Sequence, residues 1–307
     1  MDQTACAGNL TGPRDGPKAE RAQPCPAADR KWVLVSAILA SALAFIDGSV
    51  VSVAVPAIRA GLGASFAEVQ WIMNAYVLLL AALILPGGAL GDRLGQRDVF
   101  AAGIAAFVAT SVWCGLAQSP EGLIAARAAK GVAGALMVPG SLALITKNYP
   151  KEERGKAIGL WSAASGLTTA LGPLVGGAIL AGGGEGAWRW LFFLNVPLGL
   201  AALALVLTRV PRDEGHPDER IDWQGAGLVT LGLGGIAYAL TRWSEGRGDA
   251  LALGAGAAGL AVLTGFWRWE RSARDPMMPP SLFADPVFSG ANALTLILYL
   301  GMGGVLF

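Results

Sequence analysis

Charged residues are scarce in this sequence. Asp, Glu, Lys and Arg make up 15% of its 307 residues, whereas soluble globular proteins carry about 25%. Apolar residues reach 54%, and the mean hydropathy is +0.52. This balance disfavours an ordinary soluble domain and indicates a membrane protein. The formal net charge of +1 provides no basic excess for binding nucleic acid.

Histidine and cysteine are nearly absent as well. The one histidine, His216, lies in a polar loop, and the three cysteines (Cys6, Cys25 and Cys114) form no C-x-x-C pair. This distribution provides neither a disulfide framework nor a zinc site. The apolar stretches contain one acid, no histidine and no Gly-rich phosphate motif, so we expect no enzyme, no metal, no cofactor and no ATP-driven pump.

Residues 1–31 lack apolar periodicity. They are rich in Pro, Gly, Ala and charge, which is typical of a disordered segment. The stretch contains Asp and Glu, and no short apolar core precedes a small-residue cleavage site. We therefore expect a disordered tail rather than a signal peptide.

Long apolar runs dominate the rest of the chain. A helix needs about 20 mostly apolar residues to cross a bilayer, and nine stretches qualify, of which the seventh and eighth are short and Gly-rich. They are 32–57, 69–90, 99–117, 122–146, 157–181, 190–208, 223–240, 251–267 and 287–307.

The loops between these spans differ in basic residues. Seventeen of the 23 Lys and Arg residues lie in the N-terminal tail and in every second loop, whereas four (Arg59, Arg189, Arg242 and Arg247) lie on the opposite side. Basic residues favour the cytoplasmic side of a membrane. The pattern therefore predicts a multi-pass protein of the plasma membrane with a cytoplasmic N-terminus.

Three charged residues fall inside the predicted spans, namely Asp47 in the first and Arg127 and Lys130 in the fourth. At 1.5 Å per residue, Asp47 lies about 15 Å from the outer end of its span, and Arg127 and Lys130 lie about 8 and 12 Å from theirs. Their i, i+3 spacing puts the two cations on one helix face. We expect an ion pair between these spans, either as a purely structural link or as a site of proton or substrate coupling.

The connection between the second and third spans is short and charged. It reads GGALGDRLGQRDVF and contains Gly88, Asp92, Arg93, Gly95 and Arg97. Glycine permits close packing and positive φ angles, which predicts a tight hairpin. From the residues alone, this is either an ordinary basic loop or a gating element.

The fifth span contains the helix-weakening stretch LGPLVGG. In a bilayer such residues are tolerated, and Gly172 and Gly176 form a small-xxx-small face that admits a neighbouring helix. Pro173 predicts a kink. The stretch is either a closely packed span without a moving part or a pivot.

These motifs resemble the major facilitator superfamily. The loop is similar to its signature G-x-L-x-D-R-x-G-x-R/K, and LIAARAAKGVAGA is similar to R-x-x-Q-G with Lys130 in place of Gln. The pattern G-x(5)-G-P-x-x-G-G, which comprises Gly166, Gly172, Pro173, Gly176 and Gly177, resembles the antiporter motif of drug exporters. The stretches AFIDGSVVSVAVPAI, WRWLFFLNVPLG and IDWQGAGL resemble those of 14-helix drug:proton antiporters.

The resemblance covers residues 32–307 and implies an all-α polytopic membrane protein with the major facilitator fold. After the tail of residues 1–31, it implies a six-helix bundle (32–210) and two additional helices (211–270). A cytoplasmic loop and the first helix of an incomplete second bundle would follow (271–307). Because the sequence stops within an apolar run, we expect the front part of a longer transporter or a truncated gene product.

The resemblance also implies a function. The chain would export small lipophilic compounds, such as drugs or antibiotics, as a monomer that uses the proton gradient. Asp47 and Arg127 would serve proton or substrate coupling, and Asp92 and Arg97 would act in cytoplasmic gating. From the residues alone, the buried acid Asp47 could load and release a proton in a site that opens alternately to each side. A second cation at Lys130 disfavours cationic substrates. The alternatives are an uptake symporter, a non-transporting membrane receptor and an inactive fragment.

Overall fold

The computed structural model describes residues 27–184, 186–215, 222–244, 246, 248–273, 276, 278 and 280–306. The helices in these ranges are α1 (Ala27–Leu62), α2 (Phe66–Leu94), α3 (Gln96–Leu116), α4 (Pro120–Asn148), α5 (Lys151–Gly182), α6 (Trp188–Phe193), α7 (Asn195–Arg209), α8 (Trp223–Ser244), α9 (Ala250–Ser272) and α10 (Pro286–Leu306), with a short 3₁₀ helix, η2 (Pro280–Ala284), before α10.

The start of the first helix differs from the prediction. Helix α1 begins at Ala27, five residues before the expected start of the first span. The predicted disordered tail otherwise falls on residues 1–26, which lie outside the described residues, as do Cys6, Cys25 and His216.

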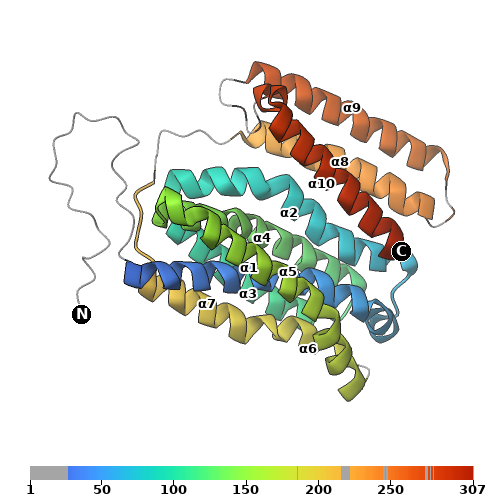
Figure 1. The fold of residues 1–307 in the computed structure, drawn as a ribbon. Helices are drawn as coiled ribbons and strands as arrows, with labels where there is room; N and C mark the ends of the chain where they lie inside the picture. Colours follow the sequence, from blue (N-terminus) through green and yellow to red (C-terminus); the bar gives the residue numbers. More distant parts are fainter. Residues whose placement is uncertain are drawn as a thin grey trace.

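The helices α1 to α7 form a bundle in which α4 is central, since it packs against α1, α2 and α3. The helix pair α8 and α9 packs together as a hairpin, and α8 lies along α2 at one side of the bundle (Figure 1). Helix α10 packs against η2 and passes across α8 in the view of Figure 1. Within the described residues, all secondary structure is thus helical, with α1 to α7 in one bundle and the pair α8 and α9 beside it.

Seven of the predicted spans are confirmed as helices long and apolar enough to cross a membrane, the sixth being α6 and α7 taken together. The seventh prediction, residues 223–240, is helical in α8 but is not among these seven, because its glycines and polar residues lower the mean hydropathy. The ninth prediction, residues 287–307, is helical as far as Leu306 in α10.

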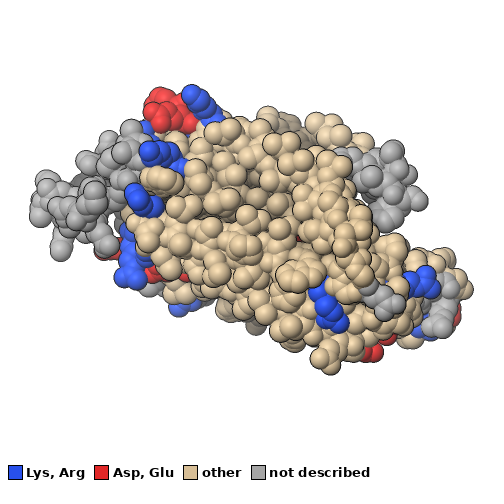
Figure 2. Space-filling view, turned by 90° about the horizontal axis from the view of Figure 1, so that it is seen from below, with Lys and Arg blue, Asp and Glu red and all other residues tan. Residues whose placement is uncertain are grey.

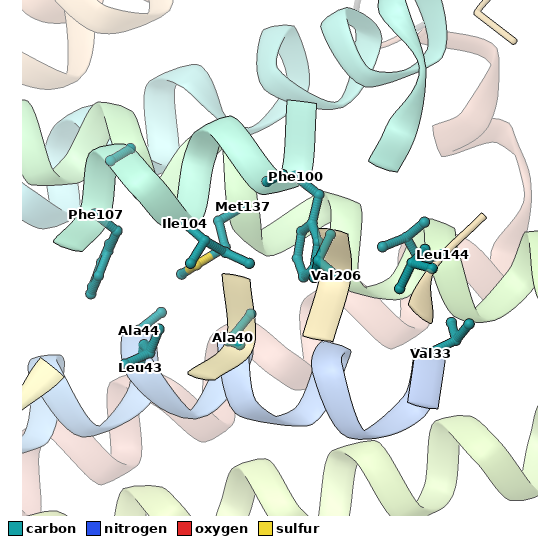
Figure 3. Close-up of a cluster of buried hydrophobic side chains, with 14 of the residues drawn as sticks. Val33, Ala40, Leu43, Ala44, Phe100, Ile104, Phe107, Met137, Leu144 and Val206 are labelled. Carbon is teal, nitrogen blue, oxygen red and sulfur yellow. The ribbon is translucent and has the colours of Figure 1, made fainter. Parts of the chain in front are cut away.

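The interior between α1, α3, α4 and α7 is filled with apolar side chains. Phe100, Ile104 and Phe107 on α3 face Ala40 and Leu43 on α1 (Figure 3). All five are completely buried. Lipid tails are as apolar as these side chains, so close van der Waals packing holds such helices together in a bilayer.

The charged side chains gather toward the ends of the molecule. In Figure 2, Lys, Arg, Asp and Glu cluster at the two ends of the visible face, and a broad band of other residues separates them. This distribution suits a bundle whose middle faces lipid and whose ends face water.

Helices α1 and α5 cross at the glycines of LGPLVGG. A Cβ atom at Gly172 would overlap the Ser49 hydroxyl and lie 2.9 Å from Ser49 Cβ, whereas one at Gly176 would make ordinary contacts with Val50 at 3.5 Å and beyond. A Cβ atom at Gly177 would meet nothing within 4 Å. The closest contact on the predicted small-residue face is therefore at Gly172, which meets Ser49, two positions after Asp47 on α1.

We expect the Gly172→Leu substitution to destabilise the bundle, because it pushes α5 away from Ser49 on α1. Overpacking of this kind costs about 1–3 kcal/mol. The measurement is thermal unfolding of the detergent-purified protein. Gly177→Leu is the matched control, and equal melting temperatures for the two variants would contradict the packing argument.

Candidate functional site

A buried ion cluster lies at the centre of the α1–α4 contact. Arg127 Nη1 donates to Asp47 Oδ2, and Lys130 Nζ donates to Asp47 Oδ1. Asp47 is 2% exposed, Arg127 1% and Lys130 0%. The ion pair predicted between the first and fourth spans is therefore present, and both cations, being on one face of α4, reach the same carboxylate.

Aromatic rings and a backbone carbonyl surround the two cations. The Arg127 guanidinium lies 4.4 Å from the centre of the Tyr76 ring, and its Nε donates to the carbonyl of Ile72 at 3.0 Å. Lys130 Nζ lies 4.6 Å from the Phe107 ring centre and 5.2 Å from that of Phe192. Such cation–π contacts partly replace the water that the buried charges have lost.

Asn195 completes the cluster, and the sequence reasoning missed it. Its amide Nδ2 donates to Asp47 Oδ1 at 3.1 Å, and its side chain is fully buried. Asn195 begins α7, where Leu194 interrupts the sixth span. Pro197 has no N–H to donate to the carbonyl four residues earlier, which accounts for the interruption. The available signal was the polar residue in the apolar stretch WRWLFFLNVPLG.

The cluster has an excess of positive charge, since it combines one carboxylate with two cations. Burying charges is costly unless they are paired and hydrogen-bonded. Here the carboxylate accepts three hydrogen bonds, yet one positive charge has no anion of its own among the described residues. The Tyr76 hydroxyl and Asn195 Oδ1 are buried and make no hydrogen bond. The site therefore contains two polar groups without hydrogen-bond partners next to an uncompensated positive charge.

The predicted tight hairpin between the second and third spans is confirmed. Helix α2 ends at Leu94 and α3 begins at Gln96, so Gly95 alone connects them, with φ +103°. This region of backbone conformation favours glycine. A Cβ atom at Gly95 would also lie 2.8 Å from the carbonyl oxygen of Asp213. Both the backbone conformation of the turn and its close contact with Asp213 therefore require glycine.

Asp213, in the loop after α7, caps this hairpin. Its carboxylate accepts hydrogen bonds from the backbone N–H of Gln96 at 2.9 Å and of Arg97 at 3.0 Å, which are orphan donors at the start of α3. Lys147 Nζ donates to the same carboxylate at 3.1 Å and lies 3.7 Å from Asp92 Oδ1. The loop after α7 thus fastens the hairpin to the end of α4.

Burial by itself raises the pKa of Asp213, but its surroundings reverse this effect. The hydrogen bonds from the backbone N–H of Arg97 and Gln96, with the nearby Lys147 ammonium, hold the pKa of that carboxyl below its ordinary value. A depressed folded-state pKa stabilises the fold above the unfolded pKa, and the contribution is lost as pH falls through the folded value. The cap is therefore complete near neutral pH and weakens only in acid.

Arg97 makes the reciprocal connection from α3 to α7. Its guanidinium donates to the carbonyls of Val206 at 3.4 Å and Leu207 at 2.6 Å, near the C-terminal end of α7. Cations at this end of a helix interact favourably with its dipole and its orphan carbonyls. Arg97 is buried, and its Nη1 also donates to Asp98 at 2.9 Å.

A family model, the Major Facilitator Superfamily, matches residues 37–307. The chain belongs to this superfamily. Its two sequence features with the clearest geometry, the charged hairpin and the intramembrane ion cluster, are thus parts of a superfamily transporter fold.

Several curated superfamily proteins are similar to this chain. A probable actinorhodin transporter of Streptomyces coelicolor is 36% identical over 95% of this chain and 52% of its own length. A tetracenomycin C resistance and export protein of Streptomyces glaucescens is 36% identical over 91% of this chain and 52% of its own length. A puromycin resistance protein of Streptomyces alboniger is also 36% identical, over 90% and 54%. The chain spans about half the length of these relatives.

Solved structures agree on the fold. A peptide transporter of the POT type gives a TM-score of 0.60 at 15% identity, covering 89% of this chain and 57% of that one. A bacterial homologue of the lysosomal transporter Spinster, in an inward-facing conformation, gives 0.52 at 24% identity, covering 82% and 64%. At these identities the likeness concerns the fold alone.

The remaining predicted residues of this superfamily protein are more loosely placed. Asp92 accepts from Gln96 Nε2 at 2.9 Å, whereas Arg93 is exposed. Gly88 has only an ordinary van der Waals neighbour, and a Cβ atom at Gly166 would meet nothing within 4 Å. Pro173 lies within α5, which continues through it. The structure therefore brings the residues of the ion cluster together and, at a separate site, those of the hairpin. Part of the antiporter motif faces outward.

We expect Asp213→Ala to loosen the hairpin at neutral pH, since two backbone N–H groups lose their acceptor. Loss of a cap of this kind costs about 1 kcal/mol, so hydrogen exchange at Gln96 and Arg97 should accelerate about fivefold. Amide exchange followed by mass spectrometry measures this change.

Glu214→Ala is the matched control for this experiment, because Glu214 is an exposed acid next to Asp213. As pH falls through the lowered pKa of Asp213 in the folded protein, the cap is lost, and the variant and the unmodified protein should converge. Equal exchange at pH 7 in all three proteins would contradict the capping role.

Proposed function

We propose that this chain is part of a proton-driven exporter of small lipophilic compounds such as drugs or antibiotics. The observation that carries the proposal is the Asp47–Arg127–Lys130 cluster, buried in the middle of apolar helices. Intramembrane ionisable residues mark ion or substrate pathways. The related Streptomyces proteins are named for the transport of, or resistance to, antibiotics, which favours export over uptake.

The proposal includes a multi-pass arrangement in the plasma membrane with a cytoplasmic N-terminus. The basic residues in the tail and in alternate loops support this orientation. It places the α2–α3 hairpin and its Asp213 cap on the cytoplasmic side. There Gly88, Asp92, Arg93, Gly95 and Arg97 would form the gating loop.

The division of the chain follows from the same proposal. Residues 32–210 would be the six-helix bundle, 211–270 the two additional helices, and 271–307 the loop and first helix of a second bundle. The close packing of α1 on α5 at Gly172 and the hairpin of α8 and α9 support this division. The antiporter motif of α5 would seal the cavity beside Asp47, and the protein would act as a monomer.

The cluster also bears on the class of substrate. Its excess positive charge repels a cation brought near it, since two unit charges 4 Å apart interact by about 4 kcal/mol at an effective dielectric constant of 20. We therefore infer that neutral or anionic lipophilic compounds are preferred over cationic ones. The proton gradient would supply the energy, with Asp47, Arg127 and Lys130 as the coupling groups.

Asp47→Asn should abolish pH-driven efflux while membrane insertion stays intact, because the two buried cations lose the one anion that pairs with them among the described residues. The measurement is efflux of puromycin from bacteria that lack their own drug exporters and express the 307-residue chain. Membrane fractions blotted for the protein provide the insertion control. Normal efflux in Asp47→Asn would contradict the proposal.

Lys130→Gln should shift the binding preference toward cations, because it removes the unbalanced positive charge. We expect the ratio of affinities for ethidium, a permanent cation, and for a neutral dye of similar size to rise about tenfold. Binding to the purified protein, followed by tryptophan fluorescence, measures this ratio without requiring transport. Lys147→Gln, at the water-facing end of α4, is the control, and an unchanged ratio in Lys130→Gln would refute the charge argument.

A further inference from the structure

We propose that the exchangeable proton of this site is held on Nζ of Lys130 rather than on the Asp47 carboxylate. The inference rests on the proposed function, since it decides which atom of the coupling cluster releases and regains the proton. The chemistry of a buried acid pointed to Asp47 in the sequence, and Lys130 stands where the superfamily motif has Gln.

The charge balance of the cluster gives the first argument. With all three groups ionised, the net charge is +1 in a site where each side chain is at most 2% exposed. Protonating Asp47 would raise the net charge to +2, whereas deprotonating Lys130 would lower it to zero. The cost of burying charge in a low-dielectric medium rises steeply with net charge, so the neutral state is the cheaper one to reach.

The hydrogen bonds around Asp47 give the second argument. Both carboxylate oxygens are already acceptors: Oδ2 for Arg127, and Oδ1 for Lys130 and Asn195. Three of the carboxylate's about four acceptor sites are thus in use, so a proton on Asp47 would have to share Oδ2 with the Arg127 guanidinium. Lys130 can lose a proton without losing its hydrogen bond, because the resulting amine can still donate to Asp47 Oδ1.

Arg127 does not compete for this role, since a guanidinium stays protonated in proteins. It also remains anchored by the carbonyl of Ile72 and by the ring of Tyr76. When Lys130 is neutral, Asp47 and Arg127 remain as a balanced ion pair. The α1–α4 contact therefore persists in both protonation states.

The other titratable groups near the cluster do not change this balance. The neighbouring helices α2 and α3 contribute the Tyr76 phenol and the buried Cys114 thiol, both neutral at pH 7. The described acids and bases of α5 lie in its first turns, from Lys151 to Lys156. On α6, Arg189 donates to the carbonyls of Gly115 and Ala117, away from Asp47.

The proposed cycle releases one proton from Lys130 and returns one to it. When the site opens to water on one side, Lys130–NH₃⁺ gives one proton to a water molecule and becomes Lys130–NH₂. When it opens to the other side, the amine takes one proton from water there. No bond other than N–H breaks or forms, and the cluster alternates between net charges of +1 and zero.

The test is a pH titration of the purified 307-residue chain in lipid nanodiscs, observed by NMR. The protein is labelled with ¹⁵N at lysine Nζ and, in a second sample, with ¹³C at aspartate carboxyl carbons. Lys130→Gln and Lys130→Arg identify the Lys130 signal independently, so one poorly folding variant does not prevent assignment. Asp47→Asn identifies the Asp47 signal, and Lys147 serves as the internal control at the end of α4.

We expect the Lys130 signal to change from ammonium to amine within the titrated pH range, while the Asp47 carboxyl signal stays constant. A titrating Asp47 signal with a constant Lys130 ammonium would overturn the inference but leave proton coupling by the cluster intact. If neither signal moves over this range, both the inference and the proposed proton coupling of this cluster are wrong.

Discussion

The interior of the bundle depends on the ion pairs and the hydrogen bond that the Asp47 carboxylate makes. This carboxylate joins α1 to α4 through Arg127 and Lys130 and to α7 through Asn195. Arg127 extends the connection to α2 through a backbone carbonyl. Removing one partner of a buried ion pair costs about 3–5 kcal/mol, and here a single acid serves two cations. Four helices therefore share one anion at the depth where water is excluded.

The hairpin between α2 and α3 is a second charged centre, with different physics. It lies where charged side chains can reach water, and hydrogen bonds between side chains and backbone groups accompany its ion pairs. Asp213 accepts from the start of α3, and Arg97 donates to the end of α7. Each satisfies orphan backbone groups at a helix end. The two contacts connect the start of α3 with the end of α7 and with the loop that follows it.

Much of the architecture could be predicted from the sequence, because crossing a membrane imposes local constraints. Runs of apolar residues predicted nine spanning helices, of which seven are confirmed, and Gly95 between charged residues predicted the tight turn. The prediction was less accurate for α8, whose glycines give a helix without the expected hydropathy. The start of α1 was also placed too late, since charged residues at its beginning carry no apolar signal.

The sequence by itself determined that this is a membrane protein and that Asp47, Arg127 and Lys130 are its intramembrane charges. Hydropathy and the cost of burying charge depend on each residue's own chemistry, so they are readable without a structure. Only the tertiary structure decided that both cations share one carboxylate, that Asn195 joins them and that Asp213 caps α3. These contacts join residues between 80 and 148 positions apart, and no local pattern specifies which helix faces meet.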